Sequence, residues 1–385
     1  MNQARELKQK FRSLYGGGDV RVYRAPGRVN LIGEHTDYND GFVMPAAIDF
    51  STWAAVAPRD DRQVVIHSEN FSEMAGFDLD ERDPVARRHW SDYARGVALA
   101  LEQAGYRLRG ANLLIRGEVP LGAGLSSSAA VEVAVGYALL EGGGFRVDRV
   151  ELAKLCQRAE GEFVGTRCGI MDQFISCNGR AGHALLLDCR SLAYQPQPLS
   201  DDVRLAICNT MVKHELAGGE YNTRRAECEA GVGHLARKLP GARALRDVTM
   251  AELEAHGNEL PEAVYRRCRH VIGETARAVR AAAALEHGDL TAFGRLMAES
   301  HRSLRDDYEV SCEELDLMVE LAGEVEGVYG ARMTGGGFGG CTINLVRAEN
   351  VERFKRAVAQ GYERATGRSP EIYVCAAAGG AERVD

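Results

Sequence analysis

Long apolar runs and paired cysteines are both missing from this 385-residue sequence. No stretch approaches the roughly 18 consecutive apolar residues of a membrane-spanning helix. The first twenty residues are charged and amphipathic, which argues against a secretory signal. The ten cysteines include no C-x-x-C spacing, and this favours buried thiols in a reducing cytoplasm over disulfides or a zinc site. We therefore expect a cytoplasmic protein without a membrane partner.

Proline and positive charge are also in short supply. There are 10 prolines, and 47 Lys+Arg against 55 Asp+Glu give a formal net charge of −8. The scarcity of proline excludes a low-complexity linker protein, and the acidic balance argues against nucleic-acid binding. A local anion site is still compatible with an acidic protein. With 45% hydrophobic residues, the chain is expected to fold into two or three globular domains.

Glycine, in contrast, is abundant. The 43 glycines make up about 11% of the chain against a usual share of about 7%. They follow no three-residue period, which excludes collagen. An excess of this kind must serve particular positions where the backbone turns sharply or approaches a ligand.

Hydrophobic periodicity and turn residues predict strands and helices in both halves of the chain. The stretch Tyr194–Pro198 followed by polar residues reads as a linker, which divides the chain into 1–200 and 201–385. We expect a helix over 6–15, β-structure over 42–57, a strand over 111–119, a helix over 129–140, helices between 220 and 325, and a strand over 341–346.

The first glycine-rich segment, VPLGAGLSSSAAVEVAVGYAL (119–139), lies between a predicted strand and a predicted helix. Its small residues let a ligand approach the backbone, and the free N–H groups at the start of a helix suit a phosphate. It is not a Walker A loop, because no G-x-x-x-x-G-K-[ST] occurs in the chain. A serine-capped helix after a glycine turn explains the segment almost as well.

The second glycine-rich segment, MTGGGFGGCT (333–342), formally contains G-x-G-x-x-G. It leads into a predicted strand and not a helix, so a dinucleotide-binding site is not supported. Five glycines in six positions indicate that a backbone or a ligand comes very close. A tight hairpin and a ligand loop are equally compatible with this segment alone.

A polar segment, RAPGRVNLIGEHTDYNDG (24–41), gathers Arg28, Glu34, His35 and Asp37 around Gly33. Such a density of donors and acceptors beside an apolar strand suits a polyhydroxyl ligand. A solvated loop with a turn at Asn39 and Asp40 is the alternative.

Together these segments resemble, in order and chain position, the three motifs of the GHMP small-molecule kinases. The polar segment 24–41, which comes first along the chain, is similar to the galactokinase signature R-x-N-L-I-G-E-H-T-D-Y. Three further stretches agree with it: CGIMDQFIS (168–176), NTMVKHELAGGEYNTRR (209–225) and SLRDDYEVSCEELD (303–316). The resemblance implies an α+β, two-domain GHMP fold. Its N-terminal domain has a mixed sheet with helices, its C-terminal domain is ferredoxin-like, and the active site lies between them.

The resemblance also assigns roles, residue by residue. It implies that Asp172 is the catalytic aspartate and Arg28 its partner, and that Ser128 and Glu160 hold Mg²⁺. The positions that match sugar-binding residues of the family are Glu34, His35, Asp37, Gly169 and Tyr221. Those that match the ATP site are Trp90, Gly122, Gly124, Leu125, Ser126, Ser127, Ser128, Gly335, Gly336 and Gly337.

The implied reaction is transfer of the γ-phosphoryl group of ATP to the anomeric hydroxyl of α-D-galactose, which gives galactose 1-phosphate and ADP. This is the first phosphorylation of galactose catabolism. A kinase for a related sugar, such as N-acetylgalactosamine, and a galactose/ATP sensor without turnover are the alternatives. The intact residues Arg28, Ser128 and Asp172 argue against a sensor. We expect a monomer that acts on small molecules.

Overall fold

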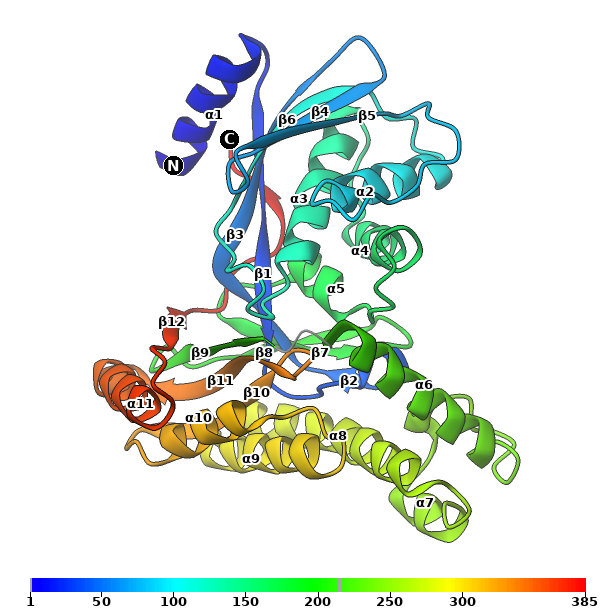
Figure 1. Cartoon of the computed structure of the whole chain (residues 1–385), viewed down its shortest axis with the longest axis vertical. Helices are drawn as coiled ribbons and strands as arrows, with labels where there is room; N and C mark the ends of the chain where they lie inside the picture. The colour runs from blue at the N-terminus through cyan, green and yellow to red at the C-terminus, as the bar shows by residue number, and fades with distance from the viewer. Residues whose placement is uncertain (1, 214–216) are drawn as a thin grey trace.

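The computed structural model describes residues 2–213 and 217–385, and within them the chain forms three β-sheets (Figure 1). Residue 1 and residues 214–216 lie outside this description. The latter belong to the stretch 209–225, which carries part of the resemblance. The largest sheet has six strands, and only the β4–β6 pair within it is parallel. Its order is β13 (Glu382–Arg383), β1 (Arg21–Asn30), β3 (Pro45–Pro58), β6 (Ala111–Gly117), β4 (Gln63–Ser68) and β5 (Glu73–Asp78).

Helices cover both faces of this mixed sheet because its central strands alternate two apolar sets of side chains. Ala54 and Val56 belong to the main core, which the helices on one face complete. Trp53 and Ala55 pack instead with the N-terminal helix α1 (Asn2–Tyr15), on the opposite face (Figure 1). The helices over the main core are α2 (Asp92–Gln103), α3 (Ser127–Gly142), α4 (Arg149–Arg158) and α5 (Met171–Asn178).

The second half of the chain builds an antiparallel sheet in the order β10-β11-β9-β12. With α11 between β11 and β12, this order matches the βαββαβ arrangement of ferredoxin-like folds, so the predicted C-terminal architecture is confirmed. The strands are β9 (Val203–Lys213), β10 (Val328–Thr334), β11 (Gly339–Arg347) and β12 (Glu371–Cys375). The helices of this half are α6 (Ala217–Leu235), α7 (Met250–His256), α8 (Glu262–Glu286), α9 (Leu290–Asp306), α10 (Glu313–Gly323) and α11 (Val351–Thr366).

The prediction that Tyr194–Pro198 is a linker is wrong. Tyr194–Pro198 forms strand β8, which pairs antiparallel with β7 (His183–Asp188), and β7 pairs on its other side with β2 (Phe42–Val43). The prolines of this segment are tolerated because β8 is an edge strand, where a missing N–H leaves no neighbour unpaired. The division into 1–200 and 201–385 stays a prediction, and β13 brings the last residues back to the first sheet.

One apolar cluster contains residues of both halves of the chain. It holds the polar segment 24–41 and the first glycine-rich segment against the second glycine-rich segment. Val29 and Leu31 of the polar segment pack in the same cluster as Leu205 and Ile343 of the second sheet. The long strand β1 therefore runs from the first sheet down to the junction with the second (Figure 1). Among the described helices, none combines the length and apolar character needed to cross a membrane.

Candidate active site

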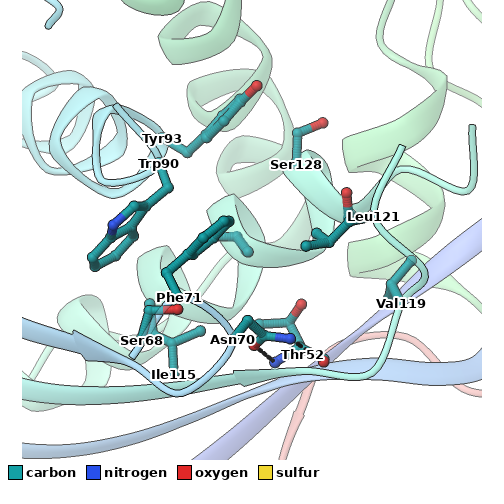
Figure 2. Close-up of a pocket in the computed structure, with 13 residues that line it drawn as sticks. Thr52, Ser68, Asn70, Phe71, Trp90, Tyr93, Ile115, Val119, Leu121 and Ser128 are labelled. Carbon is teal, nitrogen blue, oxygen red and sulfur yellow. Dashed lines mark hydrogen bonds between the residues drawn. The ribbon is translucent and has the colours of Figure 1, made fainter. Parts of the chain in front are cut away.

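Two cavities carry the predicted site residues, and one of them opens at this junction. The first is polar, has a volume of about 200 Å³ and is lined by residues from both halves of the chain. The second is mostly apolar, has a volume of about 210 Å³ and lies over strands of the first sheet (Figure 2). The polar cavity is lined by Arg28, Glu34, His35, Asp37, Glu160, Thr166, Cys168, Gly169, Met171, Asp172, Tyr221, Gly335 and Gly336.

Strand β1 meets the first glycine loop through its own bulge. The register of β1 against β3 shifts between Pro26 and Arg28, and the Arg28 N–H donates to the carbonyl of Leu125 at 3.1 Å. A Cβ at Gly27 would lie 2.7 Å from that carbonyl oxygen, too close for any side chain. Gly27 therefore allows the strand and the loop to touch, and this contact places Arg28 at the mouth of the loop.

Asp172, the second residue of α5, receives two hydrogen bonds from one guanidinium. Arg28 Nε lies 2.8 Å from Oδ1 and a terminal nitrogen lies 2.7 Å from Oδ2. The Ser126 hydroxyl also donates to Oδ2, and Arg28 donates to the Gly124 carbonyl at 2.6 Å. Burial opposes the charge of Arg28, but Asp172 and Glu34 outweigh it and raise the pKa of the guanidinium. The carboxylate is fixed on one side and borders the polar cavity on the other.

Glu34 is held by a second buried arginine. Arg332 of β10 donates to its carboxylate at 2.8 Å and to the carbonyl of Asn30 at 2.8 Å. The Arg332 side chain is 0% exposed and that of Glu34 is 4% exposed. Burial raises the pKa of Glu34, although Arg332 and Arg28 favour its charged form. The backbone N–H groups of Gly33 and Glu34 both donate to Glu274 of α8, at 2.9 and 3.2 Å.

His35 and Asp37 extend the polar wall. His35 has a left-handed φ of 62°, and its buried Nε2 has no hydrogen-bond partner. Burial, with the positive charge of neighbouring side chains, lowers its pKa to about 3, so the ring is neutral. Burial and the charges of Asp172 and Glu34 raise the pKa of Asp37 to about 7. Asp37 is therefore about half protonated near neutral pH.

Gly169 and Tyr221 complete the same wall. A Cβ at Gly169 would overlap the Asp37 carboxylate, so glycine is required for Asp37 to reach the cavity. The ring of Tyr221, from α6, lies 5.6 Å from His35 and 5.4 Å from Tyr38 between centroids. All five residues predicted to hold the sugar thus line one cavity.

Glu160 lies on a π-helical turn, η2 (Ala159–Val164), that interrupts the chain between α4 and α5. Burial and the charge of Asp172 raise its pKa to about 7, while hydrogen bonding to Ser128 favours its charged form. The Gln173 amide donates to Glu160 at 2.6 Å and to the fully buried Glu132 at 3.0 Å. A hydroxyl and a carboxylate that gains from a nearby cation fit Mg²⁺, which prefers oxygen ligands and usually keeps waters and phosphate oxygens. In the described residues, no three His, Cys, Asp or Glu side chains gather as a closed metal site.

At the start of α3, the N-cap side chain accepts no hydrogen bond from the backbone N–H groups of the helix. Ser126 precedes the helix with a left-handed φ of 57°, and its hydroxyl bonds to Asp172 instead of capping α3. Gly122 and Gly124 have φ values of 72° and 73°. Ser127 and Ser128 of this first turn line the apolar cavity. The predicted phosphate site thus has exposed helix N–H groups, a positive dipole end and glycines that keep the approach open.

The second glycine loop lies against the first. A Cβ at Gly335, where φ is 85°, would lie 3.2 Å from the Gly124 carbonyl oxygen. Gly336 lines the polar cavity with Gly335. Gly337 instead turns toward the backbone of Val310, whose carbonyl accepts from the Phe338 N–H at 2.7 Å. The segment is therefore the hairpin between β10 and β11, and two of its glycines also border the cavity.

Aromatic side chains form one wall of the apolar cavity, as Figure 2 shows. The rings of Phe71 and Trp90 are nearly parallel, with an angle of 11° and centroids 5.8 Å apart. The Trp90 indole N–H donates to Glu73 at 2.8 Å. Leu121 faces them from the first glycine loop and is 60% exposed. An exposed apolar slot of this size suits a flat aromatic ligand.

Sequence reasoning missed several residues that hold this site together. Arg332 directly precedes the second glycine motif, and Gln173 directly follows Asp172, so both positions carried a signal. Glu274 lies in a charged helix without any motif. Phe71 precedes Trp90 by a loop and a strand, and no pattern links them.

Comparisons with known proteins agree on one family. The galactokinase galactose-binding signature matches residues 9–58, and the GHMP kinase N-terminal and C-terminal domains match 92–180 and 281–364. The galactokinase of Roseiflexus sp. (strain RS-1) is 51% identical over 379 residues, 98% of this chain and 97% of that protein. That of Chloroflexus aggregans is 51% identical over 96% of this chain and 95% of that protein. The crystal structure of Lactococcus lactis galactokinase complexed with galactose superposes with a TM-score of 0.95, at 39% identity and 99% coverage of both chains.

Proposed function

The chain belongs to the galactokinase family of the GHMP kinases, and from this premise we propose that it phosphorylates α-D-galactose at its anomeric hydroxyl. The products are galactose 1-phosphate and ADP, and the reaction is the first phosphorylation of galactose catabolism. Family membership makes the protein an ATP-dependent sugar kinase. The observation that carries the finer assignment is Asp172, which borders the polar cavity and is bound by Arg28 and Ser126 of the adjoining phosphate loop.

The polar cavity is assigned to the sugar. Glu34 and Asp37 offer carboxylate oxygens, which accept hydrogen bonds from hydroxyl groups. His35, Tyr221 and the backbone beside Gly169 supply the rest of the wall. This assignment is supported by the density of polar groups and by the shared fold with a galactose complex at 39% identity.

The reaction needs little covalent help from the protein, because phosphoryl transfer passes through a loose transition state. The anomeric oxygen forms a bond to the γ-phosphorus while the bond to the β,γ-bridging oxygen of ATP breaks. Asp172 orients the hydroxyl and accepts its proton. The proton moves to Asp172 late, once bonding to phosphorus has made the hydroxyl acidic. Arg28 holds the Asp172 carboxylate in place through two hydrogen bonds. It also donates to the Gly124 carbonyl of the first glycine loop, so its positive charge would lie beside the phosphoryl group.

ATP is assigned to the apolar cavity and the two glycine loops. The adenine ring would lie against Trp90 and Phe71, and the phosphates would reach the start of α3 at Ser127 and Ser128. Ser128 and Glu160 would hold Mg²⁺ there, and the ion would neutralise phosphate charge during transfer. Burial and the charge of Asp172 raise the pKa of Glu160 to about 7, so a bound cation would favour its charged form.

We also propose that the protein acts in the cytoplasm as a monomer, without nucleic-acid or membrane partners. The ten free cysteines support a reducing compartment.

One assay tests the proposed function. Purified protein with ATP, Mg²⁺ and a panel of galactose, glucose and N-acetylgalactosamine should release ADP fastest with galactose. No galactose-dependent ADP would refute the proposal, and faster release with N-acetylgalactosamine would assign the related kinase. Asp172→Ala should abolish turnover while calorimetry still detects galactose binding. Turnover of that variant at the native rate would remove Asp172 from the mechanism.

A further inference from the structure

A chain of hydrogen bonds leads from His35 away from the sugar cavity. His35 Nδ1 lies 2.8 Å from the hydroxyl of Tyr38, and that hydroxyl lies 2.8 Å from the hydroxyl of Tyr308. The Tyr308 hydroxyl in turn lies 3.2 Å from the sulfur of Cys228. Tyr308 and Cys228 are both 0% exposed. The chain thus joins the polar segment after β1 to α6 and to the residues that follow α9.

The imidazole ring is locked in this position by packing. Its centroid lies 4.8 Å from that of Tyr308, and the ring of the buried His270 lies 4.5 Å from Tyr308, tilted by 38°. The Asn39 amide donates to the His35 carbonyl at 3.0 Å. His35 itself is 4% exposed and lines the polar cavity. Since Nδ1 is occupied by Tyr38, the ring meets a ligand through Nε2, which makes no well-formed hydrogen bond in the sugar-free protein. The backbone of Gly336 lies near this nitrogen and favours a proton on the ring.

Two proton arrangements satisfy this chain. In one, the thiol donates to Tyr308, Tyr308 to Tyr38, and Tyr38 to Nδ1, which leaves the imidazole proton on Nε2. In the other, every bond is reversed, and Nε2 becomes an acceptor. Each phenol has a single proton, so the chain cannot mix the two without breaking a bond.

The donor and acceptor strengths select the first arrangement. In the first arrangement the Tyr38 O–H donates to an imidazole nitrogen, which is a good acceptor. In the reversed arrangement the Tyr308 O–H would donate to the thiol sulfur of Cys228, which is a weak acceptor. Burial raises the pKa of Cys228 to about 11, so the thiol keeps the proton that it has to donate. The pKa of His35, about 3, keeps the ring neutral and leaves it one proton to place.

We propose that Tyr38 and Tyr308, with Cys228 at the end of the chain, are positioning residues that fix the His35 proton on Nε2, so that the ring donates a hydrogen bond to a sugar oxygen. The identity of the ligand as a sugar rests on the proposed function. The consequence concerns specificity. When charged, Glu34 and Asp37 can only accept hydrogen bonds. A donor on the same wall allows the site to bond to the oxygen of a sugar hydroxyl as well as to its hydrogen.

The first experiment reads the tautomer directly and needs no enzymatic activity. Long-range ¹H–¹⁵N spectra of the sugar-free protein, labelled on histidine, distinguish the two ring nitrogens, and His35→Gln identifies the His35 signals among the ten histidines. We expect the Nε2–H form in the native protein and a mixture with the Nδ1–H form in Tyr38→Phe. A native Nδ1–H form, or an unchanged tautomer in Tyr38→Phe, would overturn the proposal.

The control is Tyr23→Phe. Tyr23 is equally buried, at 0% exposure, and its hydroxyl donates to Glu141 at 2.9 Å in the main N-terminal core. The Tyr23→Phe variant also removes one buried phenol hydroxyl and should leave the His35 signals unchanged. If Tyr38→Phe does not fold, Tyr308→Phe replaces it. Tyr38 then loses the donor that sets its own direction, and a minor Nδ1–H population should appear. If Tyr308→Phe shows no Nδ1–H population, the proposed role of Tyr308 in fixing the tautomer is overturned.

Kinetics supply the second readout. Loss of one positioned hydrogen bond should raise the KM for galactose about tenfold in Tyr38→Phe and leave kcat within about twofold. A deoxygalactose that lacks the hydroxyl facing Nε2 should be equally poor for the native protein and for Tyr38→Phe. A uniform loss with every deoxygalactose would mean a merely structural role. If the protein fails to phosphorylate galactose at all, the proposed function falls, while the tautomer result stands or falls by itself.

Discussion

Asp37→Asn should stabilise the sugar-free protein at pH 8 and remove the pH dependence of its galactose affinity. The reason is the pKa of Asp37, which burial and the charges of Asp172 and Glu34 raise from 3.8 to about 7. Because the folded pKa lies above the unfolded one, the charged carboxylate costs stability. That cost is absent below the unfolded pKa, grows as the pH rises, and is complete above about pH 7.

The size of the effect follows from the shift. A difference of about 3 pKa units corresponds to at most about 4 kcal/mol of unfolding free energy at pH 8. Asparagine keeps the shape and removes the charge, so we expect a gain of about 1 to 4 kcal/mol at pH 8. At pH 5 the folded carboxyl is protonated but the unfolded one, with its pKa of 3.8, is already charged, so the gain should be less than half as large, at most about 1.7 kcal/mol. Thermal or urea denaturation at the two pH values, without sugar or Mg²⁺, measures it.

The same titration governs sugar binding if hydroxyl groups donate to the Asp37 carboxylate. With a pKa of about 7, roughly 9% of the molecules carry the charged form at pH 6 and roughly 91% at pH 8. The apparent galactose affinity should therefore rise about tenfold over this range. His35, with a pKa of about 3, adds nothing to the change. Calorimetry without ATP provides the assay, and Asp37→Asn should bind weakly and without this slope. A flat affinity profile in the native protein would refute the reasoning.

Two further perturbations separate ATP binding from the stability of the sugar site. Trp90→Ala should raise the KM for ATP about tenfold through lost base stacking, with the KM for galactose unchanged; an equal rise in both would remove Trp90 from the nucleotide site. Arg332→Met should lower the unfolding free energy by about 3 kcal/mol or more, because Glu34 would keep a buried charge without its partner. Adding Glu34→Gln to Arg332→Met should recover a large part of that loss, and a double variant less stable than the single one would contradict the ion-pair explanation.

Local patterns in the sequence predicted most of the elements and the contiguous motifs. Strand β6 over Ala111–Gly117 and helix α3 over Ser127–Gly142 agree with the expected strand over 111–119 and helix over 129–140. The linker expected over Tyr194–Pro198 was wrong. Its prolines indicate a linker unless it is known that the strand lies at a sheet edge. The Phe71–Trp90 wall and the Glu274 contact depend on distant chain segments meeting, and single-sequence spacing holds no information about that.

The same long-range contacts explain why the polar cavity requires both halves of the chain. Its loop belongs to β1, but the Gly33 and Glu34 N–H groups are held by Glu274 of α8, and the Glu34 carboxylate is held by Arg332 of β10. Although burial opposes its charge, Arg277 and His270 lower the pKa of Glu274 to about 2, so this acceptor stays ionised at every physiological pH. Two fully buried charged groups from the second half thus shape a loop from the first. An isolated first half would leave that loop without its acceptor and Glu34 without its counter-ion. Formation of the polar cavity is therefore coupled to docking of the two halves.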